Sequence, residues 1–479
     1  METIARLDVL RGRDAANRLE SPMSNRITTI NPATEAEVAT YDRMTDDQVT
    51  EAIEACHAAF ETWKLVSLED RAEKIKAFGQ VLRDNKEDFA ELMTREVGKL
   101  IGDGRDEIDL CAAICDFTAA NGPKELADEE REIPGGTGVI TYAPVGVIYG
   151  IQPWNFPCYQ VVRYAVANLM AGNGILLKHA ELCTGSGLYL RDLFEKAGLP
   201  KNLFTTLLID HDQSDKVIAN DHVRGVTLTG SDSAGRVVAG EAAKVLKKTV
   251  LELGSNDAYV VLDDADLDLA VESCVQGRLY NAGQTCVAAK RFIVTEANYD
   301  AFVERFTEHM KAMEPGDPTD SSTKLGPMAS IQLRDDLAKQ VEDSVAKGAR
   351  VLCGGEVPDR KGAYYPATVL VDVAPGQPAY DDELFGPVAS VIKAGDDEDA
   401  MRIANDSRYG LGGGIFSKNE KRARELASRH FDTGMVCINT YNLAIPNMPF
   451  GGVKNSGYGR EHGGFGMKEF VNAKSLYMA

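Results

Sequence analysis

Short, continuous runs of apolar residues alternate with amphipathic segments through the middle of the chain. From about residue 138 the apolar runs are Val145–Ile151, Ile175–Leu177, Leu203–Leu208, Val226–Leu228 and Val250–Leu253. Runs of this length predict strands that are buried on both faces of a sheet. Helical segments such as Gly187–Ala197 and Ala234–Val245 separate them. The alternation predicts an α/β fold with a parallel, doubly wound sheet.

A second series of the same kind follows and predicts a second doubly wound α/β domain. Its expected strands lie near Ala258–Leu262, Arg291–Val294, Val388–Lys393, Gly414–Phe416 and Met435–Asn439. Ligands of such sheets bind at the carboxyl ends of the strands. Polar residues that follow a predicted strand are therefore the first candidates for a functional site.

The N-terminal third is predicted to be helical. Thr45 and Gln48 have the spacing of a capping box, which closes the first turn of a helix. Apolar residues then recur at helical spacing, at Val49, Ile53, Cys56 and Phe60.

Composition and net charge say more about the binding partners of the protein than about its fold. A chain of 479 residues with 44% hydrophobic and 26% charged residues predicts two or three globular domains. The 73 acidic residues outnumber the 52 basic ones, for a formal charge of −21. This balance argues against nucleic acid and anionic membranes as partners. A small anionic substrate is still compatible with it, because a local basic pocket suffices.

Targeting signals are not evident, so a cytoplasmic protein is expected. The sequence has no run of eighteen apolar residues and no secretion-signal pattern. Residues 1–22 contain four arginines and four acidic residues, which argues against an acid-poor mitochondrial presequence. We expect residues 1–22 to be a poorly ordered extension and Met23 to be an alternative start.

The nine cysteines are odd in number and scattered, which disfavours a disulfide framework. Cys111 and Cys115 lie one helical turn apart, but no nearby His or Cys pair completes a zinc set. We expect no metal site.

Cys286 is the cysteine whose surroundings best fit an exposed thiol. It lies in the segment 281–287, where a glycine and small or polar neighbours allow a tight loop. Two interpretations are open. A cysteine is often a buried, inert small hydrophobe. Alternatively, this loop carries a nucleophile.

Two further polar residues follow predicted strands. Asn155 stands between Pro153 and Pro157, which would hold its amide rigidly where it can donate to developing negative charge. An asparagine here can also be a simple turn former. Lys178 ends the next strand, where it faces either the ligand crevice or solvent.

The segment 229–235 and Glu252 complete the candidate chemistry. The glycines of 229–235 allow a tight turn whose amides could meet a phosphate. The spacing does not match the Rossmann fingerprint, and Arg236-Val237 replaces the Lys and Ser or Thr of a Walker loop. Glu252 ends an apolar strand, so its carboxyl should have a raised pKa that suits a general base.

Taken in order, these motifs resemble those of the NAD(P)-dependent aldehyde dehydrogenase superfamily, from about residue 28 to 479. The matching segments are Pro153-Trp-Asn-Phe-Pro157, Gly230-Ser231 with Gly235, Glu252-Leu-Gly254, Gly283-Gln-Thr-Cys286, Glu383-Leu-Phe-Gly-Pro387 and Pro449-Phe-Gly-Gly452. Six segments in one order are far more specific than any one of them.

The resemblance implies three catalytic roles. Cys286 would attack the aldehyde carbon, and the Asn155 side chain with the Cys286 amide would hold the oxyanion. Glu252 would activate the water that hydrolyses the thioester. Since this acid is present, hydrolysis is favoured over transfer to coenzyme A.

The resemblance also implies residues that bind the dinucleotide. They are Trp154, Lys178, Glu181, Gly230, Ser231, Glu383 and Phe385. Glu181 would accept from ribose hydroxyls and repel a 2′-phosphate, which favours NAD, with NADP also possible. The sequence departs from the family pattern at Lys178-His-Ala-Glu181, where Lys-Pro-Ser-Glu is commoner, and at Ser255, where a second glycine is usual.

Among these enzymes, the chain is most like bacterial succinate-semialdehyde dehydrogenases. Arg163, eight residues after Asn155, matches an arginine that holds the substrate's distal carboxylate there. Phe450 is expected to contact the substrate as well. A second arginine and a serine of the vertebrate-type clamp are absent, because this chain has Tyr280 and the pair Ala444-Ile445 at those places.

Several alternatives remain. Arg163 is equally compatible with an internal salt bridge or an exposed charge. The substrate could be another small semialdehyde or a range of aliphatic aldehydes. A non-catalytic structural protein on the same fold is a further alternative, although it would not need Cys286, Asn155 and Glu252 together.

The resemblance implies a domain plan and a homo-oligomer. Residues 23–124 and 145–253 would form the cofactor-binding domain, and 254–470 the catalytic domain. Strands in 125–144 and 471–479 would pair with a neighbouring subunit in a homodimer or homotetramer. Both segments contain residues of β character.

Overall fold

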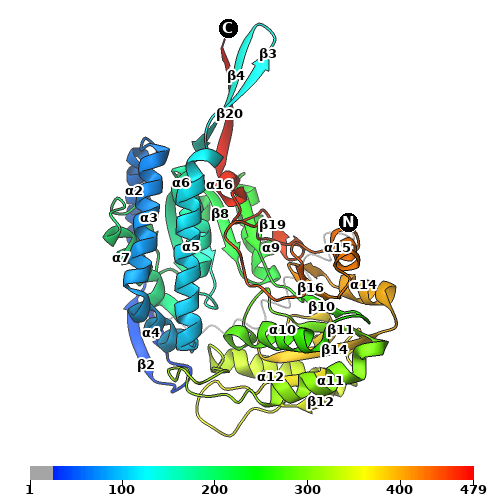
Figure 1. Ribbon diagram of the computed structural model, residues 1–479. Helices are drawn as coiled ribbons and strands as arrows, with labels where there is room; N and C mark the ends of the chain where they lie inside the picture. The colour runs from blue at the N-terminus through cyan, green and yellow to red at the C-terminus, as the bar shows by residue number, and fades with distance from the viewer. Residues whose placement is uncertain (1–24, 479) are drawn as a thin grey trace, which may run out of the picture.

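The computed structural model describes residues 25–478. The expectations for residues 1–22 and for Met23 as a start lie outside the described residues. Two sheets with helices on both faces form two lobes, and a narrow arm projects from one of them (Figure 1). No helix in the described part is long and apolar enough to cross a membrane.

The first sheet has six strands in the order β19-β9-β8-β5-β6-β7. Five of them are parallel, and β19 is antiparallel to β9. The strands are β5 (Val147–Gln152), β6 (Gly174–His179), β7 (Phe204–Thr206), β8 (Val223–Thr229), β9 (Lys248–Glu252) and β19 (Gly457–Tyr458). All five strands predicted from the apolar runs of this half are therefore present.

Helices cover both faces of this sheet, which explains the unbroken apolar runs of its strands. One face packs against α3 (Leu68–Asp84), α5 (Ile101–Glu125), α6 (Tyr159–Ala171) and α7 (Thr184–Lys196). The other packs against α2 (Asp46–Trp63), α8 (His211–Ala219) and α9 (Asp232–Lys244). Helix α2 begins at the predicted capping box, with both hydrogen bonds present.

The second sheet has seven strands in the order β12-β13-β14-β11-β10-β16-β17. Only β12 is antiparallel to its neighbour. The strands are β10 (Ala258–Val261), β11 (Arg291–Thr295), β12 (Arg350–Cys353), β13 (Thr368–Val371), β14 (Val388–Ala394), β16 (Gly413–Phe416) and β17 (Cys437–Ile438). The five predicted strands are confirmed, whereas β12 and β13 were not predicted.

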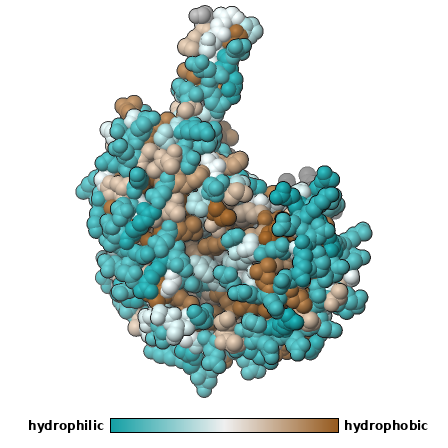
Figure 2. Space-filling model, viewed as in Figure 1, coloured by the Kyte–Doolittle hydropathy of each residue, from teal (hydrophilic) through white to brown (hydrophobic). Residues whose placement is uncertain are grey.

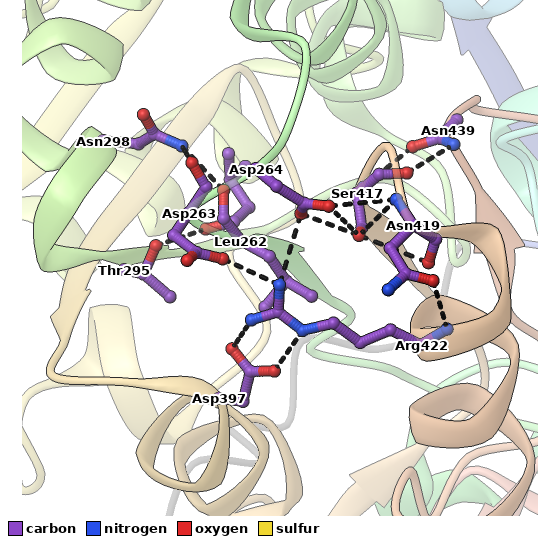
Figure 3. A network of polar contacts seen from close by, with 11 residues as sticks. Leu262, Asp263, Asp264, Thr295, Asn298, Asp397, Ser417, Asn419, Arg422 and Asn439 are labelled. Carbon is purple, nitrogen blue, oxygen red and sulfur yellow. Dashed lines mark hydrogen bonds and ion pairs between the residues drawn. The ribbon is translucent and has the colours of Figure 1, made fainter.

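Two helix layers enclose this sheet as well. One consists of α12 (Ile331–Ala346), α14 (Asp397–Asn405) and α15 (Glu420–Arg429), and the other of α10 (Leu267–Leu279) and α11 (Glu296–Lys311). The Arg422 guanidinium of α15 joins this layer to the end of β10 by contacting Asp263, Asp264 and Asp397 (Figure 3). This network fixes α14 and α15 against the sheet.

The remaining elements are short or lie at the edges. They are β1 (Arg26–Ile30), β2 (Glu37–Asp42), α4 (Lys86–Val97), η2 (Glu181–Cys183), η3 (Tyr280–Gly283), α13 (Pro378–Asp381), β15 (Tyr409–Gly410), β18 (Val453–Lys454) and α16 (Phe465–Glu469). The β1–β2 hairpin was missed by the expectation of a helical N-terminal third. Its polar composition hides the alternation on which a strand prediction depends.

The arm is a three-stranded antiparallel sheet of β3 (Glu129–Ile133), β4 (Gly136–Pro144) and β20 (Val471–Met478). The predicted strands in 125–144 and 471–479 thus pair with each other within one chain. In the view of Figure 2, hydrophilic residues surround the body, and apolar residues are exposed mainly between the two lobes.

The domain boundary near residue 470 needs correction. Residues 457–458 form β19 on the edge of the first sheet, and α16 packs against α6 of the same lobe. This part of the chain, expected in the catalytic domain, returns to the cofactor-binding side. A strand of two residues carries no readable hydrophobic pattern, so its sheet could not be assigned from sequence.

Candidate active site

The order of the first sheet places the predicted site residues at one edge. The chain order reverses between β5 and β8, and ligands of open α/β sheets bind at the carboxyl ends of strands beside such a point. Asn155 follows β5, Lys178 lies at the end of β6, Gly230 follows β8, and Glu252 ends β9. The topology therefore brings these four residues toward one crevice.

Cys286 reaches this crevice from the second lobe on a tightly bent segment. Asn281 and Ala282 have φ angles of 54° and 53°, in the left-handed region. Gly283 has a φ of 73°, and a Cβ there would lie 2.3 Å from the Gly386 carbonyl oxygen. Only glycine fits this close approach. The Cys286 residue is partly exposed, as are two other cysteines, Cys353 and Cys437.

The Asn155 side chain is tied to the cysteine loop. Its Nδ2 donates to the Gln284 carbonyl at 3.0 Å, and Asn281 Nδ2 donates to the Asn155 carbonyl at 2.8 Å. Asn155 is 4% exposed. An amide nitrogen carries two protons, so one remains for a substrate oxygen. The turn and the cysteine loop thus fix each other across the interface of the lobes.

Burial raises the pKa of the Cys286 thiol to about 11, while the positive charges of Arg163 and Lys290 oppose this rise. Glu383 and Glu252 raise it further, because negative charges disfavour a thiolate. A thiolate at Cys286 therefore depends on the two cations beside it.

Glu252 is buried at 2% exposure, and neither carboxyl oxygen has a hydrogen-bond partner among residues 25–478. Burial raises its pKa well above the ordinary value, and Glu461 adds to this effect, whereas Arg163 opposes it. Gly451 leaves room for the carboxyl, because a Cβ there would lie 2.8 Å from Glu252 Oε1. The raised pKa agrees with the property expected of a general base.

Arg163 already has a counter-charge within the protein, and its expected role as a carboxylate clamp stays a prediction. Its side chain is fully buried and forms an ion pair with Glu461. Its Nη2 donates to Thr229 Oγ1 at 3.0 Å. The alternative of an internal salt bridge is the one observed, because a buried guanidinium needs a counter-charge whether or not substrate is present.

Phe450 lies between this arginine and the nucleophile. Its ring centre is 4.6 Å from the Arg163 guanidinium carbon, and it packs with Val287, Leu411 and Cys286. A cavity of about 410 Å³ adjoins this cluster. Its lining includes Val287, Leu443, Ala444, Ile445 and Phe450 and contains no lysine or arginine among the described residues.

Trp154 and Phe385, two of the residues expected to bind the dinucleotide, are in contact. The Trp154 and Phe385 rings meet edge to face with centres 5.7 Å apart. Glu383 Oε1 lies 3.2 Å from Lys290 Nζ, and burial raises the pKa of the Glu383 carboxyl. These groups come from both lobes.

At the phosphate end, the expectation of free amides holds only in part. The Gly230 amide is used, because it donates to the Glu252 carbonyl at 3.0 Å. Ser231 caps α9, and its hydroxyl accepts from the Ala234 amide. The positive end of α9 still faces the carboxyl edge of the sheet, where a phosphate is favoured.

At the adenosine end, Lys178 is buried at 8% exposure, and burial lowers its pKa, whereas Glu181 raises it. Glu181 is exposed and forms an ion pair with Arg43 at 2.8 Å. Within residues 25–478 no cluster of His, Cys, Asp or Glu could hold a metal ion.

Three neighbours of the site were not predicted as site residues. Glu461 pairs with Arg163, Lys290 contacts the Cys286 carbonyl, and His179 Nε2 lies 2.9 Å from the Pro157 carbonyl oxygen. For Lys290 a signal exists in the sequence, since a lysine directly before an apolar strand is out of place unless it is paired. Glu461 lies almost 300 residues from Arg163, so no local pattern could connect them.

Comparison with known proteins supports the family that the motifs resemble. The model of the aldehyde dehydrogenase family matches residues 19–476. A succinate-semialdehyde dehydrogenase of Deinococcus radiodurans, named for NADP(+), is 44% identical over 460 residues and covers 96% of this chain and 95% of its own. An Escherichia coli succinate semialdehyde dehydrogenase, named for NAD(P)+, is 43% identical and covers 95% of this chain and 98% of its own.

A solved structure agrees with the fold. The succinic semialdehyde dehydrogenase of Streptococcus pyogenes, in complex with NADP+, aligns with a TM-score of 0.92 and 40% identity. The alignment covers 94% of this chain and 99% of the other. Both the resemblance and the α/β fold class are confirmed: the chain belongs to the aldehyde dehydrogenase family.

Proposed function

We propose that the protein oxidises an aldehyde to a carboxylic acid with NAD(P)+, and that succinate semialdehyde is its substrate. The observation that carries the chemistry is the position of Cys286. Its thiol lies on a loop bound to the Asn155 amide, and its pKa responds to Glu252, Arg163 and Lys290. Nucleophile, oxyanion donor and base are thus close to one another.

Cys286 as a thiolate would add to the aldehyde carbon and form a carbon–sulfur bond. The resulting oxyanion would accept from the second N–H of Asn155 Nδ2 and from the Cys286 amide. Loss of hydride from the tetrahedral carbon leaves a thioester on Cys286. Glu252 would then take a proton from water, whose oxygen attacks the thioester and releases the acid and the thiol.

The dinucleotide supplies the hydride acceptor when it is bound. Glu383 and Phe385 would hold its nicotinamide ribose, Trp154 and the N-terminus of α9 with Ser231 would lie at its pyrophosphate, and Lys178 with Glu181 would hold its adenosine. Trp154, Lys178 and the start of α9 lie at the carboxyl edge of the first sheet, and Phe385, which contacts Trp154, approaches with Glu383 from the second lobe.

We propose that NADP is accepted as well as NAD. Glu181 alone would repel a 2′-phosphate, but its ion pair with Arg43 offsets that charge. The relatives from D. radiodurans and S. pyogenes are named with NADP. This weakens the preference for NAD that Glu181 suggests from sequence alone.

The assignment of succinate semialdehyde rests on the relatives named above. One observation favours a rival, a neutral aliphatic aldehyde. Arg163 already has Glu461 as its counter-charge, and the cavity beside Val287 has no cation in its described lining. A substrate carboxylate would have to share the guanidinium with Glu461 or displace it.

Initial rates over a panel separate these candidates. The panel contains succinate semialdehyde, glutarate semialdehyde, butanal and hexanal, each with NAD and with NADP. The proposal predicts the highest kcat/KM for succinate semialdehyde, and activity with both dinucleotides. A higher kcat/KM for butanal would favour the rival, and no reduction with any aldehyde would contradict aldehyde oxidation altogether.

We also propose a homo-oligomer in which the arm meets a neighbouring subunit. Tyr477 at 79%, Met478 at 49% and Leu476 at 41% exposure are large apolar side chains on β20. Both outer strands of the arm sheet, β20 and β3, have an edge that pairs with no other strand in the described part of the chain. The expected cytoplasmic location and absence of nucleic-acid and membrane partners remain predictions.

A further inference from the structure

Lys290 is a buried lysine directly behind the nucleophile. It lies four residues after Cys286, just before β11, and is 2% exposed. Its Nζ donates to the Cys286 carbonyl at 2.6 Å and to the Thr285 carbonyl at 3.1 Å. The ammonium thus holds two consecutive carbonyls of the nucleophile loop.

Ser255 contacts the same carbonyl and the same ammonium. It lies in the segment that joins β9 of the first lobe to β10 of the second. It is fully buried, its hydroxyl donates to the same Cys286 carbonyl, and it accepts from Lys290 Nζ at 2.8 Å. The usual glycine at this position would have no side chain to offer. The departure from the family pattern at Ser255 therefore adds a donor to the main chain of the nucleophile.

The same ammonium also faces the cofactor side of the site. Glu383 Oε1 lies 3.2 Å from Lys290 Nζ. Lys290 consequently stands between the carboxylate expected at the nicotinamide ribose and the carbonyl of the nucleophile. An ammonium has three protons, and here four acceptors surround it.

The neighbouring Arg291 makes a useful contrast. It is equally buried, but its guanidinium donates to the carbonyls of Asn256, Ile403 and Ala404, away from the thiol. Arg291 therefore braces the second sheet. The contacts of Lys290 go to the nucleophile loop and to Glu383, so general bracing does not account for them.

We propose that Lys290 is a positioning residue for the nucleophile: with Ser255 it fixes the Cys286 main chain, and its ammonium shares positive charge between Cys286 and Glu383. The inference rests on the proposed function, in which Cys286 attacks the substrate. The inference adds Lys290 as a residue that contacts both the nucleophile loop and Glu383, the carboxylate expected at the nicotinamide ribose.

The electrostatics agree with this geometry. Lys290 lowers the pKa of the Cys286 thiol, and Glu383 raises it. The other titratable or charged groups around the thiol are Arg163 and Tyr159 from α6, Glu252 from β9, and Tyr441. None of them contacts the Cys286 carbonyl in the described hydrogen bonds.

The test is the pH dependence of Cys286 alkylation by iodoacetamide in the full chain, followed by peptide mass spectrometry. This readout needs neither aldehyde nor dinucleotide. Lys290→Met is expected to raise the midpoint by about one pH unit, which means about tenfold slower alkylation below the midpoint. Lys290→Arg keeps the positive charge, so its midpoint should stay close to that of the wild type. A purely structural role would change the amount of folded protein but not the midpoint.

Lys247→Met is the matched control. Lys247 also binds two main-chain carbonyls, those of Ile218 and Asn220, but directly precedes β9, at the opposite end of that strand from Glu252. Its variant should leave the midpoint unchanged. An unchanged midpoint in Lys290→Met, or an equal shift in Lys247→Met, would overturn the proposal.

Two further variants keep the test decisive if Lys290→Met does not fold. Lys290→Gln removes the charge but retains a donor, and it should also raise the midpoint. Glu383→Gln removes the competing carboxylate, so the midpoint should fall, and no change in either variant would overturn the proposal. Cys286→Ser tests the proposed function separately: full activity in that variant would refute the nucleophile, whatever Lys290 does to alkylation.

Discussion

Glu252 is a carboxyl group held at the end of a strand without a hydrogen-bond partner. Both oxygens are buried and unpaired. Such an arrangement costs stability once the group is ionised, since a buried charge without a partner is unfavourable. It leaves the carboxyl able to bind and release a proton, which is what activation of a water molecule requires.

Glu252→Gln separates the role of this carboxyl in proton transfer from its effect on stability. We expect thioester hydrolysis to fall by about 10²–10⁴-fold, so that one equivalent of NAD(P)H forms in a burst and turnover then stops. Because the folded pKa is raised above the unfolded value, the stabilising contribution of Glu252 is present at low pH and lost as pH rises through the folded pKa. The variant should therefore be more stable than the wild type at alkaline pH.

Rapid mixing with stoichiometric enzyme measures the burst, and urea unfolding at pH 6 and pH 9 measures the stability. Steady turnover at the wild-type rate in Glu252→Gln would contradict the role of this residue as the base.

Arg163 and Glu461 form a buried ion pair beside Glu252. Arg163→Leu should destabilise the protein by about 3–5 kcal/mol, because Glu461 is left buried without a counter-charge. Activity should fall for charged and neutral aldehydes alike. The double variant Arg163→Leu with Glu461→Leu should regain part of the stability, and urea unfolding of all three proteins gives the comparison.

Two results would contradict this assignment. A loss of less than about 1 kcal/mol in Arg163→Leu would be typical of an exposed pair. A selective loss of activity on succinate semialdehyde, with butanal unaffected, would restore Arg163 as a dedicated carboxylate clamp.

At the scale of elements, the turn that carries Asn155 is attached to the end of β6 by His179. Its Nε2 donates to the Pro157 carbonyl at 2.9 Å in the tautomer whose Nδ1 accepts from the Ala180 amide at 3.0 Å. This histidine replaces the commoner proline of the family motif. This sequence thus has a hydrogen bond between β6 and the turn that carries Asn155.

His179 predicts a particular acid sensitivity. Burial lowers its pKa to about 4, below the ordinary value of 6.5. As pH falls from 6.5 toward 4, the imidazole takes up a proton in the unfolded chain but not yet in the folded protein. The free energy of unfolding therefore decreases over this range. The loss is roughly 3 kcal/mol for a single group shifted this far.

His179→Gln should remove that part of the pH dependence, whereas substitution of the exposed His309 should not. Unfolding by urea at pH 7, 5.5 and 4.5 measures it in both variants. Equal pH dependence in His179→Gln and the wild type would contradict a buried neutral imidazole.

Most strands with both faces buried were predictable because their sequences are continuous apolar runs, although β13, whose four residues are also buried, was missed. All strands predicted from such runs are present, within a few residues of their bounds. Strand β12 has an exposed residue, Arg350, and β19 has only two residues, so neither carries a clear period. Edge strands depend on their neighbours for their conformation, and a pattern read along the chain does not contain those neighbours.

At the scale of the whole molecule, the site was predictable where one residue sits in a recognisable local motif. Asn155, Glu252 and Cys286 were found in this way, and the topology places them at the same crevice. The partners Glu461 and Lys290 were not, because Glu461 is distant from Arg163 in the sequence, and the contacts of Lys290 with Ser255 and Glu383 follow only from the fold. The ion pair of Arg163 spans 298 positions, the difference between 461 and 163.

The arm gives a prediction about assembly. Substituting both Leu476 and Tyr477 by Lys should lower the molar mass measured by light scattering after size-exclusion chromatography, because charge would replace exposed apolar side chains at the expected interface. Leu246→Lys is the control, since Leu246 is 95% exposed elsewhere on the surface. An unchanged molar mass in the double variant would contradict assembly through the arm.

The return of residues 457–461 to the first sheet has a consequence for how the enzyme comes into being. Synthesis on the ribosome delivers the N-terminal lobe first. Strand β9, which carries Glu252, nevertheless receives its outer neighbour β19 only when residue 458 has emerged, and Arg163 receives its counter-ion only at residue 461. A nascent chain that has already made both β9 and the Cys286 loop therefore still lacks a finished general-base pocket, and activity requires residues up to 461 to have been synthesised.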